Sequence, residues 1–313
     1  MNSVVDEYIK VKKINTPFGY FGSKNKIALQ LCTHLPPHNC WVEVFCGSAA
    51  LTLSKVKSQI EIINDIDNDI VNFFQQLRNN NKELLRLIQL TPYAEQELIL
   101  ARTKEGELSA VERARRFLVQ SMMAINGVFG DERGGFSYSD SYSRNGHEAR
   151  VNRWNSLPNR LDTVIKRLKS VRVENKDARK IVKRYLNRPA TLLYLDPPYL
   201  GDRTNGYNID ANNEKFHTEL LKLANKANCM IFISGYENDL YNSILTDELG
   251  WSTKKIETST KGSNGTSYGR TEVLWMNRNF TEALENNYVP ILLTDEEKKQ
   301  KKVNPERITD NDN

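Results

Sequence analysis

Four consecutive residues, Asp196-Pro197-Pro198-Tyr199, follow an apolar segment of strand type at 191–195. Two prolines directly after a buried strand end its hydrogen-bond ladder, so the Asp196 carboxylate is held at the carboxyl edge of a sheet. That carboxylate and the Pro197 carbonyl can both accept hydrogen bonds from one planar amino group. Such bonds favour the tetrahedral nitrogen that a conjugated exocyclic amine needs to act as a nucleophile, and the Tyr199 ring offers a face for stacking a base.

A second group of residues surrounds an earlier turn, where Phe45 and Cys46 precede Gly47. Gly47 lets the backbone approach a bound nucleoside, and Asp65, at the end of the next strand, can accept hydrogen bonds from ribose hydroxyls. The G-x-G-x-x-G phosphate fingerprint is missing, which disfavours a dinucleotide-dependent oxidoreductase. An adenosine cofactor without pyrophosphate, such as S-adenosylmethionine, fits better. A plain tight turn at Gly47 and a helix N-cap at Asp65 remain the structural alternatives.

Positive charge is concentrated in one part of the chain. The net charge is +5, but residues 144–188 hold 14 Lys and Arg against four Asp and Glu, and the remaining residues sum to −5. Proteins that neutralise phosphates concentrate basic groups in this way. We therefore take Arg144, Arg150 and Arg153 as candidate DNA-binding residues, with a solvated basic helix face as the alternative.

The elements that must position these residues alternate between strand and helix. A helical stretch at 25–35 ends at two prolines, and a Gly-rich stretch at 126–146 indicates a long loop or small hairpin. Helical periodicity covers 68–127, and a further helix is expected at 214–227. Strands are expected at 41–45, 59–64, 191–195, 230–235 and 272–276.

This alternation predicts an α/β fold with an inserted helical and loop region. We expect a discontinuous catalytic domain at 1–65 and 189–294, with the DNA-binding insertion at 66–188. Residues 295–313 form a charged tail without apolar pattern, which we expect to be disordered.

Composition excludes several classes of protein. The 313 residues contain no apolar run long enough to span a membrane and no apolar signal segment near the start. The four cysteines form neither a C-x-x-C pair nor a disulfide framework, so we expect a reducing, cytoplasmic setting and no metal site. No Pro-Cys pair is present for cytosine-5 chemistry, and His147 and His217 are expected to be exposed.

These residues together carry a resemblance to a known family. The sequence resembles the Dam-like N6-adenine DNA methyltransferases, over about residues 17–277, and the order of its motifs is that of the family's α group. The matching segments are 18–24, 42–49, 64–67, 126–127 and 196–199, with further similarity at 233–236 and 270–272. The resemblance implies that the sheet is Rossmann-like, of the kind found in S-adenosylmethionine-dependent methyltransferases, and that the insertion serves target recognition.

The resemblance implies roles by position. Tyr20 and Lys24 match residues of the family's cofactor site, and Asp65 matches the acidic residue on the cofactor's ribose. Asp196 matches a residue at both the cofactor and the target amine. The segment 42–49, with Glu43, Phe45 and Gly47, matches the motif for the methyl donor, and Asn126 and Gly127 match a loop that lies against DNA. Two positions depart from the pattern: Val44 stands where proline is usual, and Ala49 where a glycine is usual.

The expected function is methyl transfer from S-adenosylmethionine to the N6 amine of a flipped adenine in double-stranded DNA, by a monomer that needs no metal. A restriction endonuclease acting on the same site would be a further partner in a restriction-modification system. The alternatives are a methyltransferase of the same fold acting on RNA or protein, which more often has Asn at the first position of the tetrapeptide, and a non-catalytic DNA-binding relative, which would be expected to lose Asp196 or Tyr199. The sequence does not specify the recognition site.

Overall fold

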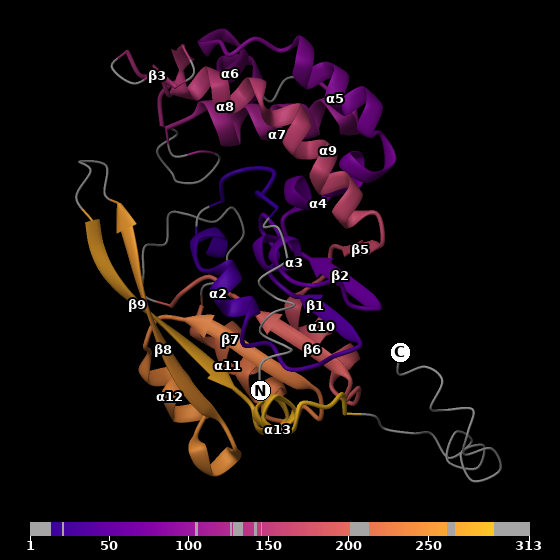
Figure 1. Cartoon of the computed structure of the whole chain (residues 1–313), viewed down its shortest axis with the longest axis vertical. Helices are drawn as coiled ribbons and strands as arrows, with labels where there is room; N and C mark the ends of the chain where they lie inside the picture. The colour runs from indigo at the N-terminus through magenta and orange to yellow at the C-terminus, as the bar shows by residue number, and fades with distance from the viewer. Residues whose placement is uncertain are drawn as a thin grey trace, which may run out of the picture.

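A seven-stranded sheet forms the centre of the protein (Figure 1). The computed structural model describes residues 14–20, 22–103, 106–125, 127, 134–140, 143–144, 146–200, 213–261 and 267–290. The strands of the sheet, in chain order, are β1 (Cys40–Glu43), β2 (Ile60–Asn64), β5 (Val171–Glu174), β6 (Thr191–Leu195), β7 (Met230–Gly235), β8 (Ser252–Lys261) and β9 (Ser267–Met276).

The strands lie in the order β5-β2-β1-β6-β7-β9-β8. Neighbouring strands from β5 to β7 are parallel, whereas β9 runs antiparallel to both β7 and β8. The chain builds outward from β1 in one direction and then returns to add β6 on the other side. Open α/β sheets bind ligands at such a switch point, beyond the carboxyl ends of the strands. The expected Rossmann-like α/β sheet is therefore confirmed.

Alternate residues of the central strands serve the two faces of the sheet. Trp41, Tyr194 and Phe232 pack on one face, where the Tyr194 and Phe232 rings stack with centroids 4.6 Å apart. Leu193 and Ile231 pack on the other. The first face is covered by α2 (Ala28–Cys32), α3 (Ala50–Ser54) and α13 (Arg278–Asn286), and the second by α10 (Ala178–Tyr185), α11 (Glu214–Ala224) and α12 (Asp239–Ile244).

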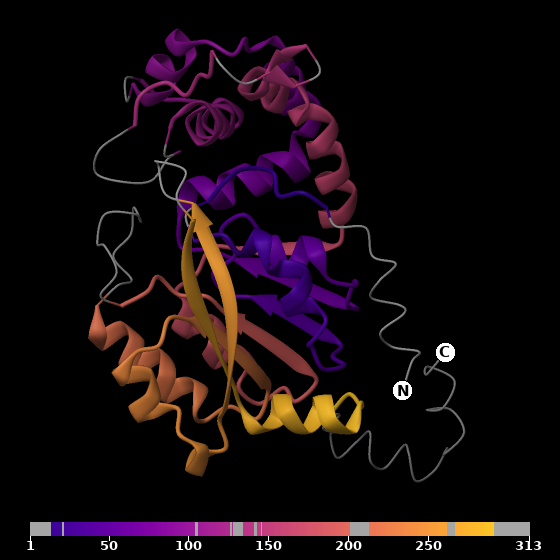
Figure 2. The same cartoon turned by 60° about the vertical axis from the view of Figure 1, so that its left-hand side comes forward.

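A helical region lies at one end of the sheet, and the β8–β9 hairpin rises toward it (Figure 1, Figure 2). Phe18 of the N-terminal segment joins its core, with ring centroids 5.2 Å from Phe73 and 4.9 Å from Phe117. The region comprises α4 (Asn68–Asn79), α5 (Asn81–Leu90), α6 (Glu95–Arg102), α7 (Ala110–Met123), α8 (Ala149–Asn155) and α9 (Leu157–Leu168), with the small hairpin β3 (Ser143–Arg144) and β4 (His147–Glu148).

Polar residues define where several helices begin. The Asp67 side chain accepts a hydrogen bond from the Asp69 amide at the start of α4, and Ser109 does the same for the Glu112 amide of α7. Each such bond satisfies one of the free amides of a first helical turn and stabilises the helix by about 1 kcal/mol.

The helix expected at 25–35 is shorter than predicted, because a 3₁₀ turn, η1 (Lys24–Lys26), precedes α2. A second 3₁₀ turn is η2 (Asp247–Leu249).

The structure differs from two expectations. Strand β5 pairs in parallel with β2, and α10 covers the sheet, so the insertion ends before β5 rather than at residue 188. His217, expected on an exposed surface, is fully buried on α11, with its Nδ1 2.8 Å from the Tyr241 hydroxyl. The expected tail at 295–313 lies outside the described residues. No helix in the described part of the chain has the length and apolar character to cross a membrane.

Candidate functional site

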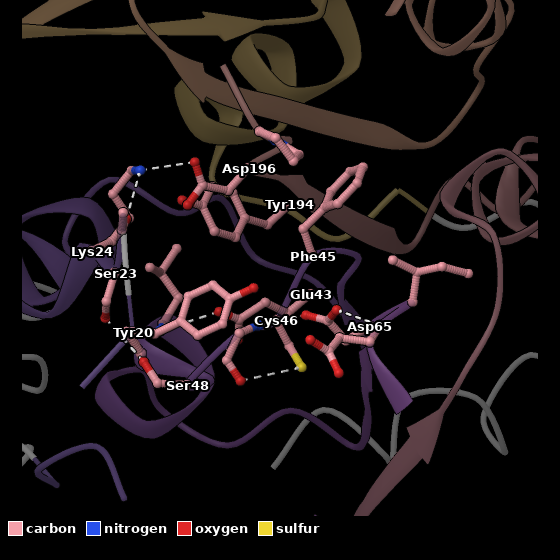
Figure 3. A pocket seen from close by; sticks show the side chains of 17 residues that line it. Tyr20, Ser23, Lys24, Glu43, Phe45, Cys46, Ser48, Asp65, Tyr194 and Asp196 are labelled. Carbon is pink, nitrogen blue, oxygen red and sulfur yellow. Dashed lines mark hydrogen bonds and ion pairs between the residues drawn. The ribbon is translucent and has the colours of Figure 1, made fainter. Parts of the chain in front are cut away.

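One cavity gathers every residue that the sequence predicted for a cofactor (Figure 3). It lies beyond the carboxyl ends of β1, β2 and β6, where the chain leaves each strand for a loop. Lys24 and Asp196 face one another on one side, and Asp65 lies apart from them on the other (Figure 3). The predicted residues that line it are Tyr20, Lys24, Glu43, Phe45, Gly47, Asp65 and Asp196.

Gly47 is fixed by its neighbours. Its backbone has a φ of +45°, and a Cβ added there would lie 2.7 Å from a ring carbon of Tyr20, so only glycine leaves room for this ring. The Gly47 amide donates to Asp65 Oδ2 over 2.9 Å, while Asp65 Oδ1 accepts from the Asp67 amide over 3.0 Å. Through these two hydrogen bonds, Asp65 connects the turn after β1 with the turn after β2. At Ala49, where the family pattern has glycine, φ is +56°.

Two carboxylates in the cavity have raised pKa values. Burial raises the pKa of Asp65 to about 6, although the amides of Asp67 and Gly47 oppose the rise. Burial likewise raises the pKa of Glu43 to about 7, against the stabilising bonds from Thr52 and Leu51 at the start of α3. Both groups are therefore costly to keep charged and favour a ligand that offers hydrogen-bond donors or positive charge.

Asp196 lies at the end of β6 in a dense polar network. Its Oδ1 accepts from the Lys24 ammonium at 2.8 Å and from the Ser234 hydroxyl, at the end of β7, at 2.9 Å. Its side chain is 15% exposed, so the carboxylate remains open to the cavity. Pro197 is buried behind it, and Pro198 lines the cavity.

Tyr199 lies beside the cavity rather than in its lining. Its hydroxyl donates to Glu272 Oε1 over 2.6 Å, and its ring packs against Tyr236 with centroids 4.4 Å apart.

The Lys24 ammonium lies close to this tyrosine. Lys24 Nζ lies 4.9 Å from the Tyr199 ring centroid and 3.3 Å from Glu272 Oε1. Burial would lower the pKa of Lys24, but Asp196 and Glu272 outweigh it and raise that pKa above its ordinary value.

The predicted DNA-binding residues fall in the helical region. Gly127 has a φ of +68° just after α7; Asn126 lies outside the described residues, as does the side chain of Arg144 in β3. Arg150 and Arg153 are exposed on α8 and form no ion pair with a carboxylate of the described residues. Arg153 reaches the N-terminal segment, because its Nη2 lies 3.4 Å from where a Cβ on Gly19 would be.

Much of the basic segment is neutralised within the protein. Arg184 and Arg172 pair with Glu174, and Arg179 pairs with Asp177 and Glu219. These ion pairs belong to β5 and α10, on the sheet side. Arg150 and Arg153, by contrast, lie on α8 near the segment that leads to Tyr20, and neither pairs with a carboxylate within the described ranges.

Three further residues were given no role from the sequence: Glu272, Ser234 and Arg160. Ser234 and Glu272 nevertheless lie in the segments 233–236 and 270–272 that resemble the family. Arg160 donates to the Pro17 carbonyl over 3.2 Å; burial and then the charge of Arg153 lower its pKa to about 10. Its Nε is buried without a hydrogen-bond partner in the described part of the chain. Ser234 and Glu272 are both polar residues next to an apolar strand segment, at 230–233 for Ser234 and at 273–276 for Glu272. This pattern was the sequence signal that could have indicated a functional role for them.

Comparison with known proteins gives one specific match. The model of the D12 class N6 adenine-specific DNA methyltransferase family matches residues 20–263, from the Tyr20 segment to the β8–β9 hairpin. No curated protein sequence matches the chain.

Solved structures are similar only at a low level. A Haemophilus influenzae protein described as a candidate methylase has 12% identity and a TM-score of 0.36, and covers 83% of this chain and 91% of its own. A Clostridium thermocellum protein described as a candidate rRNA methylase has 11% identity and a TM-score of 0.35, with coverages of 82% and 96%. A precorrin 8w decarboxylase of Methanobacterium thermoautotrophicum has 9% identity and a TM-score of 0.32, with coverages of 80% and 88%.

Proposed function

Because the chain belongs to the D12 class N6 adenine-specific DNA methyltransferase family, we propose that its cavity binds S-adenosylmethionine and that Asp196 receives the N6 amine of an adenine flipped out of double-stranded DNA. The observation that carries this proposal is the position of Asp196. Its carboxylate lies at the end of β6, on the wall of a cavity whose other side holds Asp65.

The residues that line the cavity fit this cofactor. Asp65 retains lone pairs for ribose hydroxyls after accepting from Gly47 and Asp67, and Tyr20 and Phe45 offer ring faces to adenine. Lys24 is the one basic side chain among the described residues of the lining, and it pairs with Asp196. Such a lining suits an adenosine compound without phosphates. The carboxylates of Glu43 and Asp196 suit a cationic ligand.

Catalysis in this scheme depends on positioning. When bound, S-adenosylmethionine supplies an electrophilic methyl carbon, which forms a bond to N6 while its bond to sulfur breaks and the electron pair stays on sulfur. Asp196 and the Pro197 carbonyl would accept hydrogen bonds from the two N–H groups of the amine and so direct the nitrogen lone pair at that carbon. The nitrogen then loses one proton, to solvent or transiently to Asp196. Holding two reactants in line lowers the barrier by several kcal/mol.

DNA is proposed to approach along the helical region. The adenine must leave the stack to reach Asp196, since its amine is otherwise paired inside the duplex. Arg150 and Arg153 on α8 would hold backbone phosphates, and the loop around Asn126 and Gly127 would lie against the bases. We propose a monomer acting in the cytoplasm of a bacterial or phage-infected cell, with a restriction endonuclease of the same specificity as a further partner.

The decisive experiment is methylation of mixed-sequence duplex DNA with methyl-labelled S-adenosylmethionine, followed by nucleoside analysis. We expect label in N6-methyladenine from the wild-type protein and none from Asp196→Ala. The matched control is Asp239→Asn, an exposed carboxylate at the start of α12, which should match wild type.

Two results would contradict the proposal. Label absent from DNA but present in RNA or protein would assign the fold to another substrate. DNA binding without any transfer would identify a non-catalytic relative. Thermal unfolding of Asp196→Ala must be similar to that of wild type for the comparison to count.

A further inference from the structure

The ammonium of Lys24 lies between two carboxylates. Its Nζ is 2.8 Å from Asp196 Oδ1 and 3.3 Å from Glu272 Oε1, and it also donates to the Gly22 carbonyl over 3.2 Å. The Lys24 and Glu272 side chains are 7% and 6% exposed. A buried ammonium that contacts two carboxylates can shift its ion pair from one to the other without losing a charged partner.

Lys24 is bound to Asp196 Oδ1, an oxygen of the carboxylate that the proposed reaction needs as the acceptor for the target amine. Asp196 Oδ1 already accepts hydrogen bonds from Lys24 and Ser234. An incoming amine must share this carboxylate with Lys24 or displace it, and a charged donor bound to Asp196 withdraws electron density from the acceptor. Efficient transfer therefore requires somewhere else for the Lys24 ammonium to bind.

Glu272 is placed to provide that second position. It lies on β9 directly before Val273, which pairs with Gly235 at the end of β7. Glu272 itself pairs with Ile256 of β8, so it lies just past the carboxyl end of β7, beside Lys24 and Asp196. Its Oε1 accepts from Tyr199 as well as from Lys24. Burial raises the pKa of Glu272, opposed by the charge of Lys24, as expected for a carboxylate whose partner is shared.

We propose that Glu272 is a positioning residue, which draws the Lys24 ammonium away from Asp196 when the target amine arrives and holds the Tyr199 hydroxyl in place. This inference rests on the proposed function. No role for Glu272 in binding the cofactor is required, because it does not line the cavity.

The test is a double-mutant cycle on methyl transfer to duplex DNA. In Glu272→Gln we expect kcat to fall at least tenfold while the dissociation constant for S-adenosylmethionine stays within about twofold of wild type. Among the described residues, Asp196 is then the one carboxylate in contact with Lys24, whose other contacts are the Gly22 carbonyl and the Tyr199 hydroxyl. In a Lys24→Met background, adding Glu272→Gln should change kcat less than twofold. Glu272→Asp should recover part of the lost kcat.

The matched control is Glu257→Gln on the neighbouring strand β8, an exposed carboxylate that contacts only Thr271 among the hydrogen bonds of the described residues. It should not change kcat. An active wild type with an unaffected Glu272→Gln, or an equal loss with and without Lys24, would overturn this inference alone. An inactive wild type would overturn the proposed function and this inference with it.

Discussion

At Gly47 the absence of a side chain determines the shape of the cavity. The φ of +45° costs a residue with a Cβ about 1–2 kcal/mol, and that Cβ would lie within 3 Å of two ring carbons of Tyr20. We expect Gly47→Ala to displace the Tyr20 ring and to lower the affinity for S-adenosylmethionine about tenfold, which corresponds to about 1.4 kcal/mol. Calorimetric titration of the cofactor measures this change.

The control for Gly47→Ala is Gly106→Ala. Gly106 has a φ of +76°, but a Cβ added there meets nothing within 4 Å. Both variants should lose stability in thermal unfolding because both carry the backbone strain. Only Gly47→Ala should lose cofactor affinity; an unchanged affinity would show that the Tyr20 ring can move without consequence.

The residues around this cavity were largely predictable from sequence, because the strands that carry them are short, apolar and end in recognisable turns. Asp65 and Asp196 follow such strands directly. Glu272 was not predictable in the same way. Its position depends on the register of the β8–β9 hairpin and on the antiparallel pairing of β9 with β7, which local patterns do not specify.

Among the elements, α9 is joined to the sheet by a buried ion-pair cluster. Both terminal nitrogens of Arg167, on α9, donate hydrogen bonds to the Glu61 carboxylate of β2, which also accepts from Lys55 at 3.0 Å. Burial opposes ionisation of Glu61, but the bonds from Arg167 and Lys55 outweigh it and lower its pKa below the ordinary value. The cluster therefore fixes α9 to β2, the strand that Asp65 follows.

We expect Glu61→Gln to lower the free energy of unfolding by about 3 kcal/mol at neutral pH, because two buried cations lose their carboxylate. A lowered folded pKa stabilises the wild type above the ordinary carboxyl pKa and loses that effect as pH falls through the folded value. The deficit of the variant should therefore shrink with acidification. Urea unfolding at a series of pH values checks this.

Glu83→Gln provides the control for the ion-pair cluster. The Glu83–Arg86 pair spans one turn of α5 on the surface, so its loss should leave the urea midpoint unchanged. A pH-independent deficit in Glu61→Gln would instead mean that the lost packing, and not the charge, matters.

Amino-acid composition alone did not locate the end of the insertion correctly. Residues 171–185 are rich in Lys and Arg, so charge grouped them with the helical region, but β5 and α10 belong to the sheet. Val171 and Val173 alternate with charged residues, which is a strand pattern. The pattern is weak because β5 has only four residues and lies at the edge of the sheet.

Over the whole molecule, the distribution of charge separates two kinds of arginine. Arg184 on α10 is neutralised by Glu174, whereas Arg150 and Arg153 on α8 form no ion pair with a carboxylate in the described ranges. Charged side chains without internal partners are the ones that can exchange counterions for phosphates. The net charge counted along the sequence could not distinguish them, because pairing is set by the fold.

We therefore expect Arg150→Ala and Arg153→Ala each to weaken binding of duplex DNA by a similar factor for all sequences, and to reduce the slope of log affinity against log salt concentration by about 0.9 per lost phosphate contact. Arg184→Ala, from the same basic segment of the sequence, should change neither quantity. Fluorescence anisotropy with labelled duplexes over a range of salt concentrations measures both. If Arg184→Ala reduced the slope as much as Arg150→Ala, DNA would have to reach α10 on the far side of the sheet, and the proposed approach along α8 would be wrong.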